Sequence, residues 1–199
     1  MRYKSEHKQE TRQRILDAVH KGFRQHGFDG AGVDGLAREA GVTSGAFYKH
    51  FNAKADAFRE SIILALGEFR GAVELFQQQQ GDAWLDEFTT FYLGDKRNCE
   101  LGESCGLQSL SPDVARSDAS TRSLFQAELE KAARVFAAGL ASPEAEPSID
   151  KAWAAIAMLI GGVTLARAVE DPALADQIAA AVRNRVIADY EADSTAVQV

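Results

Sequence analysis

Hydroxyl, basic and small apolar side chains gather in one short segment of the chain, where their types suit contacts with nucleic acid. Thr43 and Ser44 can donate hydrogen bonds to phosphate oxygens or base edges, and the Ala46 methyl can touch a thymine methyl. Lys49 and His50 follow within reach of phosphates. This combination predicts that the segment contacts nucleic acid.

The residues around this segment predict two short helices joined by a tight turn. An amphipathic helix is expected over residues 33–40, and Gly41 can adopt the positive φ that a turn between two crossing helices requires. Thr43 or Ser44 can cap the second helix, which ends at residues 48–51. The second helix has few apolar residues, so one of its faces remains for a partner. Two helices in this arrangement typically present the second one to the major groove of DNA.

Basic residues are concentrated in the first part of the chain, although the formal net charge is −7. Residues 1–60 contain 11 Lys and Arg, 8 Asp and Glu, and all four His, whereas residues 61–199 contain 11 basic and 21 acidic residues. This asymmetry is typical of a small DNA-binding head on an acidic body, although chance clustering on a solvated surface would produce it as well.

Length and composition are those of an ordinary soluble helical protein. The 199 residues are 46% hydrophobic and include four Pro, which suits one or two domains. No apolar run is expected to reach the roughly 18 to 20 residues that cross a membrane. The first residues lack the apolar core of a signal peptide, so a cytoplasmic location is expected, with the two Cys as free thiols.

Apolar residues recur with helical spacing almost throughout, which predicts an all-α fold. The expected helices cover about residues 8–26, 33–40, 43–51, 53–79, 82–93, 120–140, 148–170 and 172–191. Gly27 is expected to stop the first helix. Residues 94–112 are expected to be irregular, residues 141–147 to form a break, and the tail after Ala192 to be frayed.

Four groups of residues occur in an order and spacing typical of one regulator family. They are Ile15-Leu16-Asp17-Ala18 with Phe23 and Gly27-Phe28, then Leu36-Ala37-Arg38-Glu39-Ala40-Gly41-Val42, then Gly45-Ala46-Phe47-Tyr48-Lys49-His50-Phe51, and Lys54. On these motifs, residues 8–60 resemble the DNA-binding head of TetR-family transcriptional regulators, and the rest matches only as a helical layout. Two departures are Gly32, where the family usually has Thr or Ser, and Gly35 inside the second helix, where it costs about 1 kcal/mol relative to Ala.

The resemblance implies a homodimeric, ligand-responsive regulator, usually a repressor that a small molecule releases from double-stranded operator DNA. It divides the chain into a helix-turn-helix DNA-binding domain, residues 1–52, and a helical ligand-binding and dimerisation domain, residues 53–199. The last two helices, 148–170 and 172–191, would pair with those of a second copy. No membrane, metal or cofactor is expected.

The resemblance also assigns roles to single residues. Tyr48 resembles the family tyrosine whose hydroxyl meets the DNA backbone, and Lys54 resembles the lysine that clamps a phosphate. Residues at the start of the first helix could anchor a flanking strand. The predicted DNA-binding residues are Thr43, Ser44, Gly45, Ala46, Tyr48, Lys49, His50 and Lys54, with Thr11 and Arg14 from the first helix.

The body is rich in aromatic residues that could line a pocket between helices. For any one of them, packing in the core is the commoner role. The predicted ligand-binding residues are Phe69, Trp84, Phe88, Phe91, Tyr92, Cys105 and Phe125. The effector itself is not predicted.

Two alternatives to a ligand-released repressor stay open. Neighbouring carboxylates favour inert thiols at Cys99 and Cys105, whereas Lys96 and Arg97 favour a redox or electrophile switch. A helical protein-interaction module is the other class. An enzyme is not expected, because the sequence has no phosphate-cradling glycine motif, HExxH or nucleophile elbow.

Overall fold

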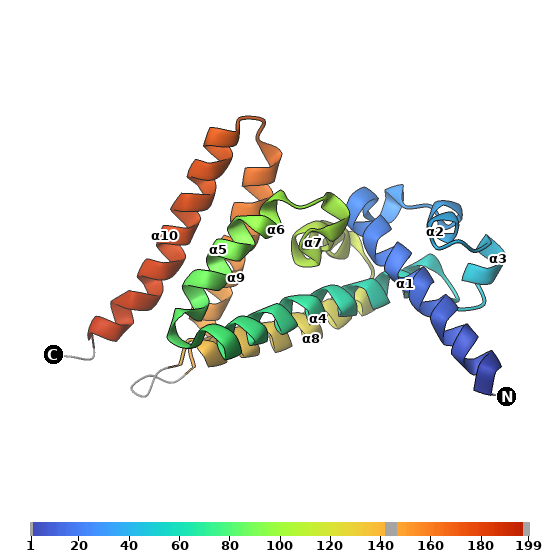
Figure 1. The fold of residues 1–199 in the computed structure, drawn as a ribbon, viewed down its shortest axis with the longest axis horizontal. Helices are drawn as coiled ribbons and strands as arrows, with labels where there is room; N and C mark the ends of the chain where they lie inside the picture. Colours follow the sequence, from blue (N-terminus) through green and yellow to red (C-terminus); the bar gives the residue numbers. More distant parts are fainter. Residues whose placement is uncertain (1, 142–146, 197–199) are drawn as a thin grey trace. The chain divides into compact units, whose positions relative to one another are not determined.

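Every regular element is a helix in the computed structural model, which describes residues 2–141 and 147–196 (Figure 1). The all-α prediction is therefore confirmed. The chain forms two compact units, each built from separated stretches of sequence. The head unit comprises residues 1–65 and 100–125, and the body unit comprises residues 66–99 and 126–199. The predicted division after residue 52 is a functional one, which these packing units do not test.

The head unit is organised around the first helix. Its elements are α1 (Arg2–Gly30), α2 (Val33–Glu39), α3 (Ser44–Phe47), the first turns of α4 (Lys54–Gln80), the 3-10 helix η2 (Leu101–Glu103), α7 (Gly106–Arg116) and the first turns of α8 (Ala119–Gly139). Helix α1 packs against α2, η2 and α7. Ile15, Val19 and Phe23 are fully buried, as their spacing of four residues predicts. His20 on the same face is buried with its Nδ1 2.8 Å from Ser61 Oγ of α4.

Helix α1 breaks at Gly27, which has φ 69° and ψ 175°. This confirms the predicted helix stop, although one more turn follows before Gly30. Only glycine adopts such a φ without strain. A Cβ atom at Gly27 would also lie 3.0 Å from a carboxylate oxygen of Asp113. The break therefore depends on the absence of a side chain at this position.

The prediction of an irregular stretch over residues 94–112 is wrong. This stretch contains α6 (Asp95–Asn98), η2 and the first part of α7. Leu107, Leu110 and Val114 form the buried face of α7, while Pro112 is exposed within the helix. Burial of that face outweighs the single backbone hydrogen bond that a proline removes.

Other boundaries differ from the predictions by a few residues. Helix α1 begins at Arg2 rather than near residue 8, and α4 begins at Lys54 rather than at residue 53. Helix α10 (Pro172–Ala196) continues past Ala192, where fraying was expected. Of the predicted break over residues 141–147, residues 142–146 lie outside the described part of the chain.

The body unit packs α5 (Trp84–Leu93) against α9 (Ile149–Ala168) and α10. The 3-10 helix η1 (Gly81–Ala83) leads into α5 in place of the expected start at residue 82. Helices α9 and α10 run side by side, orange and red in Figure 1. Ser148 caps α9 by accepting a hydrogen bond from the Lys151 N–H at 3.4 Å. The start of α9 thus agrees with the prediction.

Helix α9 is more apolar than the sequence analysis expected. By length and composition it could cross a membrane, and only 39% of its apolar stretch is buried within the protein. One face, including Ile156, Leu159 and Val163, is buried in the body unit as in a core helix. Its other face carries exposed residues such as Ala157 and Leu165. Apolar residues on both the buried and the exposed face therefore account for the high hydropathy of α9.

Candidate nucleic-acid interface

The turn between α2 and α3 has the conformation that the sequence predicts. Gly41 has φ 68°, and its N–H donates to the Arg38 carbonyl at 3.0 Å. Thr43 caps α3, because its Oγ1 accepts a hydrogen bond from the Ala46 N–H at 3.2 Å. Ser44 has another role, since its hydroxyl donates to the Asp34 carboxylate of α2. The two hydroxyls predicted to contact DNA thus also fix the geometry of the turn.

Regular α-helical structure ends at Phe47, but the chain continues to coil as far as Phe51. The Lys49 N–H donates to Ala46 O at 3.1 Å, and the His50 N–H donates to Phe47 O at 2.9 Å. These are the tighter turns common at helix ends. Phe47 and Phe51 are buried, which agrees with the core role their apolar rings suggest. We call residues 43–51 the recognition segment.

Between its two buried phenylalanines, the recognition segment exposes polar groups. Tyr48 is 52% exposed, and its ring stands edge-on against Phe47 at a centroid distance of 5.5 Å. Thr43, Gly45 and Lys49 are also exposed. Ser44, Ala46 and His50 are partly buried. The buried phenylalanines therefore leave some of the predicted contact residues exposed, namely Thr43, Gly45, Tyr48 and Lys49.

Of the residues at the start of helix α1, some lie beside the turn between α2 and α3 and others have partners within the protein. A guanidinium nitrogen of Arg14 lies 3.8 Å from where a Cβ of Gly41 would be, which places this exposed side chain beside the turn. Thr11 is partly buried. Arg12 is engaged within the protein, since it pairs with Glu60 and lies 5.2 Å over the ring of Phe51.

Lys54 is also engaged within the protein. Its Nζ donates to the Phe28 carbonyl at 2.7 Å and lies 4.3 Å from the centroid of the Phe28 ring. The sequence predicts a phosphate contact for Lys54 but gives no sign of this internal one. Local motifs do not reveal it, because Phe28 and Lys54 are far apart along the chain.

His50 lies in a positive environment at the end of the recognition segment. Partial burial lowers the pKa of His50 below 6.5, and the charges of Lys8, Arg12 and Lys49 lower it further. Its Nδ1 is buried and has no hydrogen-bond partner among the described residues. Several cations therefore act on one small surface, which favours a polyanion as its partner.

At Gly32, the departure from the usual family residue has the expected local consequence. Gly32 occupies the N-cap position of α2, and no side chain caps that helix. Neither Gly32 nor Gly35 has an atom within 4 Å of where a Cβ would stand. Both positions thus lack a group that could bond or pack there.

A comparison with known proteins fits this geometry. Residues 15–60 match the family described as bacterial regulatory proteins, tetR family. By this match, the chain carries the DNA-binding head of the TetR family. This TetR-family chain is 49% identical over 51 residues to the HTH-type transcriptional regulator SrpR of Pseudomonas putida, which is 26% of the chain and 24% of SrpR. It is 50% identical over 50 residues to the uncharacterized HTH-type transcriptional regulator TtgW, also of Pseudomonas putida, which is 25% of the chain and 37% of TtgW.

The similarity to these curated relatives covers only about a quarter of this chain, and the chain spans only about a quarter to a third of their length. A solved structure extends the comparison to the rest of the TetR-family fold. A TetR transcriptional regulator from Chloroflexus aurantiacus superposes with a TM-score of 0.75 over 94% of this chain and 97% of that one. The identity is 17%, so this likeness concerns the fold alone. The matched relatives are named as transcriptional regulators, and TetR-family members are not enzymes.

The two cysteines of the TetR-family chain lie in different compact units. Cys99 belongs to the body unit and donates its thiol hydrogen to the Lys96 carbonyl, with Sγ 3.1 Å from that oxygen. Cys105 belongs to the head unit and is buried at the start of α7. In the part of the chain that the structure describes, no group of His, Cys, Asp or Glu could hold a metal ion.

We expect His50 to make the stability of the head depend on pH. Its pKa in the folded protein lies below 6.5, so the unfolded chain binds the proton more readily. The contribution of neutral His50 to the free energy of unfolding is fully present above about pH 6.5. It is lost as the pH falls toward the pKa of His50 in the folded protein. Urea unfolding at about pH 7.5 and about pH 5.5 measures it, and His50→Gln should remove it.

The matched control is His26→Gln, which replaces an exposed histidine of the same unit. The carboxyls of Asp118 and Glu128 also have lowered pKa values. They change the stability only below about pH 4.5, outside the range from about pH 5.5 to about pH 7.5 that the experiment uses. Equal pH dependence in the wild type and in His50→Gln would contradict the assignment.

Proposed function

We propose that this TetR-family protein is a DNA-binding transcriptional regulator that acts in the cytoplasm as a dimeric repressor and leaves its operator when a small molecule binds. The observation that carries the proposal is the recognition segment, in which exposed Tyr48 and Lys49 stand between buried Phe47 and Phe51. An aromatic anchor of this kind fixes the direction in which the contact groups point.

Salt dependence tests the DNA-binding part. Wild-type affinity for duplex DNA from upstream of the protein's own gene should fall steeply as salt rises, because each phosphate contact releases condensed counterions. Lys49→Ala should weaken binding and reduce the slope of log K against log salt by about 0.9. Tyr48→Ala should weaken binding with only a small loss of stability, since its ring is half exposed and contacts Phe47 alone among the aromatic rings of the described residues. Fluorescence anisotropy over a salt series measures these values.

Arg134→Ala is the matched control for Lys49→Ala, because it removes one exposed positive charge from the body unit. It should leave both affinity and slope unchanged. If the wild type binds the duplex weakly and without a salt slope, the chain is better described as a helical protein-interaction module.

The outer faces of α9 and α10 support a dimer. Leu165 of α9 is 60% exposed and Leu174 of α10 is 41% exposed, beside small residues such as Ala154 and Ala157. Within the body unit, Arg97 of α6 holds α10 through Asp176 at 2.6 Å, and Arg183 of α10 pairs with Asp86 of α5. The two helices are thus fixed while one apolar face stays uncovered. Two heads reading half-sites about 34 to 36 Å apart also require a second copy.

Placing a charge on this face should separate the two copies. Leu165→Glu is expected to convert the protein into a monomer in sedimentation velocity and to weaken operator binding, because one head alone reads one half-site. Leu75→Glu introduces the same charge at an exposed position of α4 and should leave the dimer intact. A wild-type monomer at micromolar concentration, or a dimeric Leu165→Glu, would contradict this interface.

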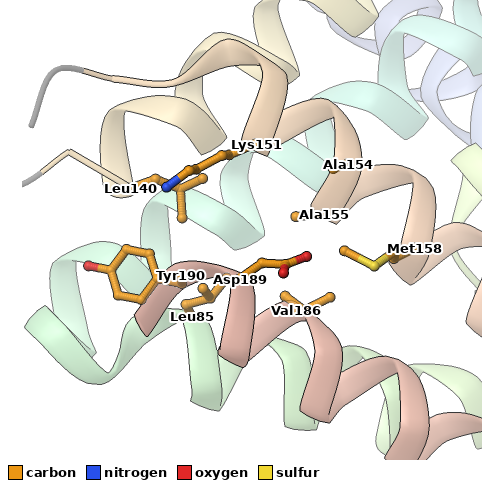
Figure 2. Close-up of a pocket in the computed structure, with 9 residues that line it drawn as sticks. All are labelled: Leu85, Leu140, Lys151, Ala154, Ala155, Met158, Val186, Asp189 and Tyr190. Atoms are coloured by element: carbon orange, nitrogen blue, oxygen red, sulfur yellow. The ribbon is translucent and has the colours of Figure 1, made fainter. Parts of the chain in front are cut away.

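A pocket of the body unit supports the small-molecule part of the proposal. It has a volume of about 80 Å³ and lies between α5, α9 and α10 (Figure 2). Its lining residues are Leu85, Leu140, Lys151, Ala154, Ala155, Met158, Val186, Asp189 and Tyr190. Figure 2 shows Lys151 from α9 on one side and Asp189 and Tyr190 from α10 on the other. An apolar interior with a few polar groups at its edge is typical of small-ligand sites.

The aromatic residues predicted from the sequence are a second candidate for the ligand site. Phe88 is fully buried, with the rings of Phe69, Trp84 and Tyr92 within 6.4 Å of it. Phe91 is partly buried. Two further predicted residues, Cys105 and Phe125, belong to the head unit. Because these body-unit rings pack against one another, we favour the pocket beside Met158.

Filling that pocket separates the two candidates. We expect small apolar probes, toluene and 1-hexanol, to lower wild-type affinity for operator DNA by about fivefold or more. Met158→Trp should bind DNA normally but lose this response, because the larger side chain occupies the pocket. Phe91→Leu should respond like the wild type. If Phe91→Leu loses the response and Met158→Trp keeps it, the effector binds at the aromatic cluster. If the probes still release both variants from DNA, neither site binds the effector.

A further inference from the structure

Phe28 is held by side chains from two other helices of the head unit. Its N–H donates to the Asp113 carboxylate of α7 at 2.7 Å. Its carbonyl accepts a hydrogen bond from the Lys54 ammonium of α4, also at 2.7 Å. One peptide residue therefore connects a carboxylate of α7 to the lysine that resembles a phosphate clamp.

These contacts follow from the break in α1. Gly27 has a non-helical conformation, so the peptide groups next to it leave the regular pattern of the helix. Partly buried N–H and C=O groups need other partners, since leaving them unpaired is costly. Asp113 and Lys54 provide those partners. Both contacts were invisible in the sequence because they join residues distant along the chain.

The Phe28 ring fixes the same lysine from a second direction. The ring packs against Phe58 at a centroid distance of 5.0 Å and against Phe23 at 5.9 Å. Lys54 Nζ lies 4.3 Å from the centroid of the Phe28 ring, within the range of a cation–π contact. The ammonium is thus held between a carbonyl and a ring face.

An ammonium held in this way can still bind a phosphate. A lysine ammonium has three N–H donors, and the Phe28 carbonyl uses one of them. Lys54 is partly exposed, so a phosphate oxygen can approach without displacing Phe28. A side chain whose position is already fixed also loses less conformational entropy when the phosphate binds.

We propose that Asp113 is a positioning residue for DNA binding. It fixes the Phe28 peptide, and Phe28 fixes the Lys54 ammonium where it meets a DNA phosphate. Asp113 lies on α7, outside residues 15–60 that match the family. This inference rests on the proposed DNA binding, and it gives α7 an influence on operator affinity without a contact to DNA.

Three substitutions on α7 test the hydrogen bond separately from the charge. Asp113→Ala removes the acceptor for the Phe28 N–H, whereas Asp113→Asn removes the same charge but keeps an acceptor oxygen. Arg116→Ala removes the other partner of Asp113, a 2.5 Å contact to Oδ1, and leaves the Phe28 bond in place. Each purified full-length variant is titrated with operator duplex over a salt series.

We expect Asp113→Ala to bind the operator about tenfold more weakly than Asp113→Asn, the upper range for one hydrogen bond. Its slope of log K against log salt should be smaller by up to about 0.9, because the Lys54 contact to phosphate is weakened. Asp113→Asn and Arg116→Ala should keep the wild-type slope. A role in folding alone would lower the thermal midpoint without changing the slope.

A double-mutant cycle with Lys54→Met gives the decisive comparison. In the Lys54→Met background, Asp113→Ala should cause no further loss of affinity. If the two effects are additive, or if Asp113→Ala and Asp113→Asn bind alike, the positioning role is wrong. A wild type that fails to bind duplex DNA would instead overturn the proposed function itself.

A second measurement covers the case in which Asp113→Ala does not fold. Amide hydrogen exchange at Phe28 in the wild type should slow when operator DNA is added, since a bound phosphate holds Lys54 and with it the Phe28 carbonyl. Lys54→Met should abolish this slowing. Exchange at Phe28 that ignores DNA would refute the connection.

Discussion

The burial of Phe47 and Phe51 is the constraint on which the recognition surface depends. Helix α3 has only four residues, and a helix of this length has no stability of its own in water. It exists because the Thr43 hydroxyl caps its start and two aromatic rings fasten its end to the core. Tyr48 and Lys49, which lie between the two rings, are then forced outward. The direction of Tyr48 and Lys49 is therefore a consequence of packing, not of helix propensity.

Those parts of the fold that depend on local chemistry could be predicted from the sequence. A positive φ at Gly27 and Gly41, a hydroxyl cap at Thr43 and the buried face of α1 all follow from neighbours within a few residues. Helix α7 shows where this approach fails. Pro112 and the glycines before it are typical of a loop, yet burial of Leu110 and its neighbours makes the segment helical. Tertiary packing therefore makes α7 a helix, although its local sequence is typical of a loop.

Contact residues for the candidate site can be proposed from the sequence, but their partners within the protein cannot. The sequence identifies Lys54 as a cation near the recognition segment, but only the folded chain places Phe28 against it. Similarly, Arg12 of α1 pairs with Glu60 of α4. These two residues are far apart along the chain, so no local motif predicts the pair. Long, flexible basic side chains can contact many partners, so the choice among them depends on the whole fold. For this reason the sequence alone does not predict which of these basic groups already have a partner within the protein.

The division of the chain into compact units gives the head a component from beyond its motif. Residues 100–125 pack with residues 1–65, so η2 and α7 belong to the same unit as the recognition segment. Two polar contacts make this junction specific: buried Arg24 donates to the Ser104 carbonyl at 2.9 Å, and Asp113 accepts from Phe28. Hydrogen bonds to buried peptide groups are sensitive to small displacements, because a carboxylate or guanidinium moved by about an ångström loses its geometry. A shift of α7 would therefore act first on the peptide after Gly27, and through it on the position of Lys54. The position of Lys54 thus depends on a helix that lies outside the residues that match the family.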